Sequence, residues 1–169
     1  MKAFFAAILN MGIIRKPSIN EYWNSKFPSQ DTCWFKKLFS RNRFQNILKF
    51  FHLVNNNDIP GRNSPGYSPT SKFQCFVDLL NTQSQRYYVP EQQLSVDESL
   101  VSTKGRTQML QYIPSKAAKF GVKLWLIVES VSGYMLHTIV YRGKRYDRTP
   151  NGTTQGTHVV KTLLNSRRI

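Results

Sequence analysis

The chain has 169 residues, 40% of them hydrophobic and 13% aromatic, which is enough apolar material for a packed core and argues against global disorder. Its 24 Lys and Arg against nine Asp and Glu give a formal net charge of +15 at pH 7. This excess favours nucleic acid as the partner, then an anionic membrane surface, over a merely soluble basic protein. No apolar run approaches the roughly 20 residues of a membrane span. Cys33 and Cys75 fit buried, reduced thiols better than a disulfide framework or a zinc site.

The N-terminal region is expected to be helical. Its first apolar segment also resembles a short signal peptide, but Asn10 interrupts it and no cleavage site follows, so a buried helix is favoured. Ser18 and Glu21 match a capping box, in which the serine oxygen accepts a backbone N–H at the start of a short helix. Asp31 or Thr32 can cap the helix after it.

The strongest helical pattern follows Ser40. Its apolar stripe, spaced i, i+3, i+4 and i+7, consists of Phe44, Ile47, Leu48 and Phe51. The cations that lie largely off this stripe are Arg41, Arg43 and Lys49. A basic face opposite the apolar stripe of a helix is ordinarily just exposed to solvent. In a chain this positive, contact with DNA phosphates is an equally good interpretation.

The second half changes from helical to strand periodicity. Residues 55–71 are rich in Asn, Gly, Pro and Ser and predict a functional or flexible loop, after which a helical stripe runs from Phe73 to Leu80. Beyond Pro90 the elements expected are strands at 94–101, 122–129 and 135–141, the last two antiparallel, and a helix at 157–165 capped by Thr157.

Asp97 stands in the middle of the first predicted strand. Alternation places it on a face with small polar residues and places Glu98 on the opposite face. A carboxylate in a core-like strand is costly to bury without a partner. From the residues alone, an ion pair with Lys104 or Arg106 is the favoured explanation, and a metal ligand beside a track of phosphates is the alternative.

Several segments together carry a family resemblance. In chain order they are M-G-I-I-R-K-P-S-I-N-E-Y-W, S-R-N-R-F-Q-N-I-L-K-F-F-H-L, L-S-V-D-E-S-L, K-G-R, Q-Y-I-P-S-K-A-A-K-F-G-V-K-L-W and S-G-Y. Any one of these segments is a weak signal, but the ordered set covers essentially the whole chain. On this set the chain resembles the piggyBac transposase family and its domesticated, transposable-element-derived relatives.

The resemblance implies an α+β fold in two parts. Residues 1–91, with the loop at 55–71, would form a helical dimerisation and DNA-binding region. Residues 92–169 would form the N-terminal part of an RNase H-like catalytic domain, with three strands and one helix, incomplete at its C-terminus. Asp97 matches the first acid of the catalytic triad and thus a ligand for Mg²⁺ or Mn²⁺, ions that prefer oxygen ligands. The cations that match the basic run after this acid, and that would grip DNA, are Lys104, Arg106, Lys116 and Lys119.

The resemblance also limits the expected activity. In the family, the second acid follows the helix expected at 157–165 and the third lies much further on, so this chain carries only Asp97 and is expected to be inactive alone. The leading interpretation is a fragment of a metal-dependent DNA transposase; whether the chain itself is an enzyme stays open. The alternative is a domesticated, non-catalytic DNA-binding or dimerisation module. Both imply DNA as partner, a homodimer, a nuclear location and no membrane, whereas a third interpretation is a basic secreted or membrane-surface protein.

Overall fold

The computed structural model describes residues 1–24 and 26–166, which form two compact units. Unit 1 is Met1–His52 and unit 2 is Leu53–Ile169, and each is described by itself. The division therefore falls earlier than the boundary at 91/92 expected from the sequence. The reason is that the helix before residue 91 packs on the sheet of unit 2, with its Asn81 bonded to the backbone of Thr138.

Unit 1 consists of short helices around an aromatic core. Its elements are α1 (Lys2–Ile13), η1 (Ile19–Tyr22), η2 (Pro28–Gln30), α2 (Cys33–Leu38) and α3 (Arg41–Phe50). The buried core residues are Phe4, Ala7, Tyr22, Phe35 and Phe44. Two partly buried hydrogen bonds tie the connecting segments to this core: the Tyr22 hydroxyl donates to the Ile14 carbonyl at 2.7 Å, and the Trp23 indole N–H donates to the Phe39 carbonyl at 2.8 Å.

The caps predicted in unit 1 are only partly formed. Ser40 caps α3 as expected, its hydroxyl oxygen accepting from the Arg43 N–H at 3.3 Å. Ser18 makes no side-chain cap, and the segment after it is a single 3-10 turn rather than an α-helix. Thr32 precedes α2, but its hydroxyl donates to the Tyr22 carbonyl and does not cap the helix. In both failed caps, the short element is held by tertiary packing of its aromatic residues.

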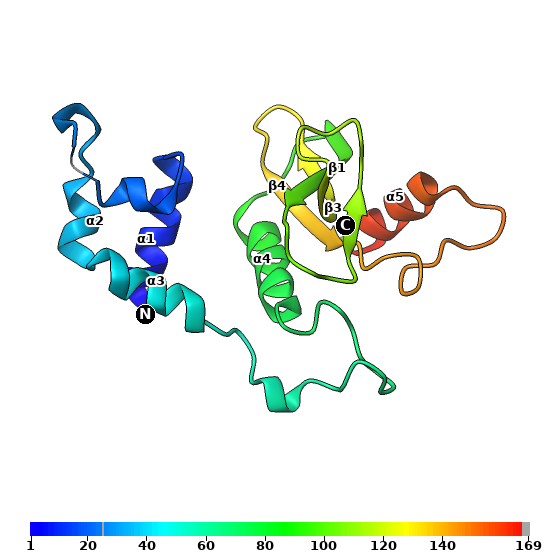
Figure 1. The fold of residues 1–169 in the computed structure, drawn as a ribbon. Coiled ribbons are helices and arrows are strands. Elements are labelled where there is room, and N and C mark those ends of the chain that lie inside the picture. The colour runs from blue at the N-terminus through cyan, green and yellow to red at the C-terminus, as the bar shows by residue number, and fades with distance from the viewer. Residues whose placement is uncertain (25, 167–169) are drawn as a thin grey trace. The chain divides into compact units, whose positions relative to one another are not determined.

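Unit 2 is a four-stranded antiparallel sheet with helices on both faces (Figure 1). Its elements are η3 (Asn56–Asp58), α4 (Gln74–Tyr87), β1 (Leu94–Ser102), β2 (Leu110–Tyr112), β3 (Phe120–Glu129), β4 (Met135–Val140) and α5 (Gln155–Ser166). The long strand β3 is central: β1 pairs along one edge, and β2 and β4 share the other edge. The α+β class, the three expected strands and the antiparallel pairing of β3 with β4 are thereby confirmed, whereas β2 is an additional strand.

The two faces of the sheet are covered by different helices. On one face, Val77 of α4 packs with Met109 and Val140. On the other face, Leu163 of α5 packs with Ile127 and Leu136. Alternation along β3 assigns Leu124 to the first cluster and Ile127 to the second, because successive residues of a strand point to opposite faces. In β4, the register shift opposite Ile127 and Val128 accompanies the placement of Leu136 and Val140 in different clusters. The nearly continuous apolar run of β3 is thus explained by burial on both sides.

Two further expectations need correction. Cys33 and Cys75 are free but exposed, since each lies on the outer side of its helix. The last helix begins at Gln155, and its cap is the Thr154 hydroxyl, which accepts from the Thr157 N–H at 3.3 Å; Thr157 is therefore inside the helix. Among the described residues, no helix has the length and apolar content that crossing a membrane requires.

Candidate nucleic-acid interface

Asp97 lies at the centre of β1, opposite Leu126 of β3, on the face of the sheet that carries α4. Its side chain is exposed, and its Oδ1 accepts a hydrogen bond from the Glu98 N–H at 2.7 Å. The ion pair with Lys104 or Arg106 that the residues alone favoured is not formed anywhere in the described part of the chain. The outer edge of β1 also has no strand partner among the described residues, so Asp97 stands beside an open edge.

Glu98 faces the other way, as alternation predicted. It pairs across the sheet with Trp125, and its Oε2 lies 2.7 Å from the Lys123 Nζ, a side chain only 12% exposed. The same ammonium lies 3.9 Å from the centre of the Trp125 ring, a cation–π contact. The charge of Glu98 is therefore neutralised by Lys123 on the α5 face. Of the two acids in β1, only Asp97 is left without a cation.

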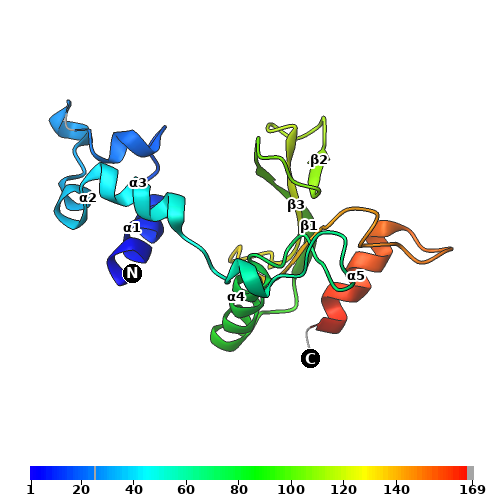
Figure 2. The same cartoon turned by 60° about the horizontal axis from the view of Figure 1, so that its bottom comes forward.

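A projecting segment follows β1 and carries most of the predicted DNA-binding cations. We call residues 103–120 the finger; Figure 2 shows its strand β2 and the start of β3 extending away from the helices of unit 2. Two backbone bonds close it: the Thr103 N–H donates to the Phe120 carbonyl at 3.4 Å, and the Ile113 N–H to the Lys119 carbonyl at 2.8 Å. The finger is thus a hydrogen-bonded element.

The finger brings one cation next to Asp97. The Lys116 Nζ donates to the backbone carbonyl of Glu98 at 3.1 Å, which places an ammonium one residue from the Asp97 backbone. Lys104, Arg106 and Lys119 are exposed, and none of them forms an ion pair with a described residue. The predicted basic run therefore lies on the one projecting element that begins where β1 ends.

The other predicted DNA-binding residues belong to unit 1. Arg41, Arg43 and Lys49 are exposed on α3, whose apolar side is anchored by buried Phe44. This arrangement confirms the amphipathic pattern of the helix. Contact with phosphates remains a prediction for these three cations.

The finger also carries an aromatic pair that the sequence did not predict. Tyr112 and Phe120 lie on neighbouring strands with ring centres 4.8 Å apart, yet they are 57% and 54% exposed. Exposed rings between cations offer stacking surfaces for bases as well as charge for phosphates. The available signal was their position at either end of a segment that contains Lys116 and Lys119; only the cross-strand register brings the rings together.

Gly121 sets the junction between the finger and the sheet. A Cβ atom at this position would lie 2.4 Å from the Val101 carbonyl oxygen and 2.9 Å from the Leu100 Cγ. Only glycine permits so close an approach of β3 to the end of β1. This approach lets both strands continue into the finger.

The remaining acids of the sheet region have structural partners. Glu129 is buried at the end of β3, where its Oε2 accepts from the Ser132 hydroxyl and, at 2.7 Å, from the Ser132 N–H. These hydrogen bonds, the hydroxyl bond first, lower the pKa of the Glu129 carboxyl below its usual value despite burial. Asp147 pairs with Arg142 at 2.6 Å. Within the described residues, no three His, Cys, Asp or Glu side chains gather closely enough to hold a metal ion.

Comparisons with known proteins identify the family of the chain. A family model described as Transposase IS4 matches residues 1–168. The chain belongs to this transposase family. A cryo-EM structure of a piggyBac transposase synaptic complex with hairpin DNA is similar at 25% identity, with a TM-score of 0.80 over 99% of this chain. The chain spans 34% of the length of that transposase, and the family resemblance seen in the sequence is confirmed.

Proposed function

We propose that this piggyBac-like transposase chain grips DNA phosphates with its finger and presents Asp97 as the first catalytic carboxylate of an RNase H-like domain. The observation that carries the proposal is the contrast between neighbouring acids in a chain of charge +15. Glu98, Glu129 and Asp147 each have a structural partner, whereas Asp97 is exposed and forms no ion pair with a described residue.

Asp97 suits a metal ligand because its carboxylate supplies the hard oxygen atoms that Mg²⁺ prefers. In a two-metal site, such ions would stabilise the attacking and leaving oxygens of an in-line phosphoryl displacement. One carboxylate is too few to hold them, and within the described residues Asp97 belongs to no group of three or more His, Cys, Asp or Glu side chains that could hold a metal ion. The proposal for Asp97 is therefore one ligand of the site, and the chain alone is expected to bind DNA without cutting it.

The finger contributes positive charge that is free to meet phosphates. Its four predicted cations are Lys104, Arg106, Lys116 and Lys119. Each phosphate contact releases condensed counterions, so the logarithm of affinity falls with the logarithm of salt concentration by about 0.9 per contact on duplex DNA. The similar transposase was solved with hairpin DNA, which supports DNA as the partner here.

The test compares duplex binding by the wild-type chain with binding by a variant in which all four finger cations are changed to Ala. If each meets one phosphate, the salt slope should fall by about 3 to 4. A matched control removes the same charge from exposed lysines elsewhere: Lys2, Lys26, Lys37 and Lys161. An equal loss of slope in the two variants would show that only net charge matters and would reject the finger as the binding element.

A second candidate function is a non-catalytic DNA-binding or dimerisation module. It is favoured by the lack of a three-ligand cluster in the described residues. Self-association is supported by α1 of unit 1, where Leu9 and Ile13 are 70% and 80% exposed, since exposed apolar side chains favour a protein interface. Light scattering of the purified chain measures its mass directly. Nuclear location belongs to both proposals, and exclusion of a tagged copy from the nucleus would contradict it.

A further inference from the structure

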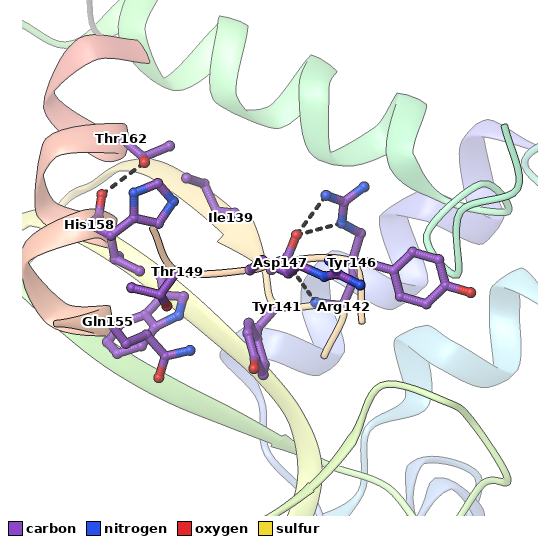
Figure 3. A pocket seen from close by; sticks show the side chains of 12 residues that line it. Ile139, Tyr141, Arg142, Tyr146, Asp147, Thr149, Gln155, His158 and Thr162 are labelled. Carbon is purple, nitrogen blue, oxygen red and sulfur yellow. Dashed lines mark hydrogen bonds and ion pairs between the residues drawn. The ribbon is translucent and has the colours of Figure 1, made fainter. Parts of the chain in front are cut away.

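A cavity of about 380 Å³ lies in unit 2 between α5, the end of β4 and the loop at 142–149 (Figure 3). Its lining includes Trp125 and Ile139, which belong to the α5 face of the sheet. Asp97 lies on the opposite face. The cavity is therefore separate from the candidate catalytic position, and its size falls in the range of small-ligand sites.

The loop that walls the cavity is fixed by an internal ion pair. Asp147 accepts from the Arg142 backbone N–H at 2.6 Å, and its other oxygen accepts from the Arg142 Nε at 2.9 Å and from Nη2 at 2.6 Å. Figure 3 shows this pair beside Tyr146. Because Arg142 is matched by Asp147, the net positive charge of the cavity comes from Arg148, which forms no ion pair with any described residue.

Several hydrogen-bonding side chains converge on the cavity without a partner in the described part of the protein. The Trp125 indole N–H is buried and unpaired, which is costly for a donor away from water. The Gln155 amide and the His158 ring also line the cavity, and no hydrogen bond from either side chain to a described residue is formed. The site is thus rich in donors and carries one unmatched guanidinium.

Aromatic side chains form part of the cavity wall. Tyr141 and Trp125 line the cavity, and one face of Trp125 is covered by the Lys123 ammonium at 3.9 Å. Tyr146 also borders the cavity, but its hydroxyl donates to Gln108, which lies outside the lining. Aromatic walls accept a planar base, an amide and an indole N–H can bond the polar edge of that base, and a guanidinium pairs with a phosphate. A nucleotide is the ligand class that uses all three features.

We infer that this cavity binds one nucleotide of a single DNA strand, with the base against Trp125 and Tyr141 and the phosphate at Arg148. The inference rests on the proposed DNA-binding function and adds a second contact, on the face of the sheet opposite Asp97. An unpaired nucleotide is required, since a base stacked within a duplex cannot enter a cavity. Duplex binding by the finger and strand binding by the cavity are therefore separable.

The test uses the indole N–H resonances of the full 169-residue chain, which has three tryptophans. The Trp125 resonance is assigned as the one lost in Trp125→Phe. It should shift on titration with a short oligo-dT strand and with dTMP, while those of Trp23 and Trp34 stay in place. Thymidine and inorganic phosphate, each supplying half of the ligand, should bind at least ten-fold more weakly than dTMP.

Arg148→Gln should weaken dTMP and oligo-dT binding by ten-fold or more and leave duplex affinity within two-fold. The control is Lys161→Ala, an exposed cation on α5 that does not line the cavity and should change neither. A Trp125 resonance that ignores both dTMP and oligo-dT, in a chain that still binds duplex DNA, would overturn the inference and leave the proposed function standing. The inference would also be overturned if inorganic phosphate shifted the Trp125 resonance as strongly as dTMP does. The same holds if dTMP shifted this resonance and oligo-dT did not. If the chain does not bind duplex DNA but its Trp125 resonance still responds to dTMP and oligo-dT, the result would contradict the proposed role of the finger and leave the cavity inference standing.

Discussion

Replacement of Gly121 by alanine should destabilise unit 2 by an amount that the geometry sets. The added Cβ would lie 2.4 Å from the Val101 carbonyl oxygen and 2.9 Å from the Val101 carbonyl carbon. These are backbone atoms, so no side-chain rotation can relieve the contact. β1 and β3 would have to separate where Val101 and Ser102 pair with Val122 and Gly121.

Overpacking of this kind costs about 1–3 kcal/mol in well-packed proteins. We expect the upper half of that range, about 2–3 kcal/mol, because the obstructing atoms are backbone and Gly121 also pairs with Gln111 of β2. For a domain of this size, 1 kcal/mol corresponds to roughly 4 °C, so the melting temperature of unit 2 should fall by about 10 °C.

Urea unfolding followed by circular dichroism measures the loss of stability. Gly156→Ala in α5 is the matched control, because a Cβ there meets nothing within 4 Å. Alanine at this helical position should stabilise the protein by up to about 1 kcal/mol. If Gly121→Ala changes the free energy of unfolding by less than about 0.5 kcal/mol, the close approach of the strands is not a constraint and the reasoning is refuted.

Three further predictions follow from the described contacts. The folded-state pKa of Glu129 is depressed by the Ser132 bonds, so its contribution to stability is present above about 4.5 and is lost as pH falls through the folded pKa; urea midpoints from pH 7 to 3 should drop less steeply in Glu129→Gln. Asn81→Ala leaves both backbone groups of Thr138 without their partners, at 2.9 and 2.8 Å, and should cost about 1–3 kcal/mol by the same assay; a change under 0.5 kcal/mol would contradict this. Purified chain with Mg²⁺ should neither nick DNA nor form hairpins, and reproducible cleavage abolished by Asp97→Ala would disprove that expectation.

Much of the local structure could be predicted from the sequence because strand and helix periods are local properties. The alternation around Asp97 predicted that Glu98 faces the other way, and the register with Leu126 and Trp125 confirms it. The apolar stripe of α3 and its Ser40 cap could also be predicted from the sequence. The ordered motifs indicated the transposase family, which the match over residues 1–168 confirms.

The failures concern ion pairs, a short strand and long-range packing, none of which a sequence period reveals. Lys104 and Arg106 are the cations that follow Asp97 most closely along the chain, but both lie beyond the end of β1, in the finger, and form no ion pair with it. β2 was missed since three residues are too few to show a period. The packing of α4 on the sheet was missed as well, because it depends on Asn81 reaching a strand 57 positions later.

The sequence by itself determined that Asp97 lies in a strand and on which face of the sheet it lies. The sequence motifs around it also indicated the transposase family. Only the tertiary structure decided that its carboxylate forms no ion pair with a described residue, whereas Glu98 on the opposite face pairs with Lys123. The structure likewise placed Lys116 at the Glu98 carbonyl and gathered Trp125, Arg148 and His158 around one cavity. The physical reason is that periodicity specifies the face on which a side chain lies, whereas pairing depends on the register of strands and the path of loops.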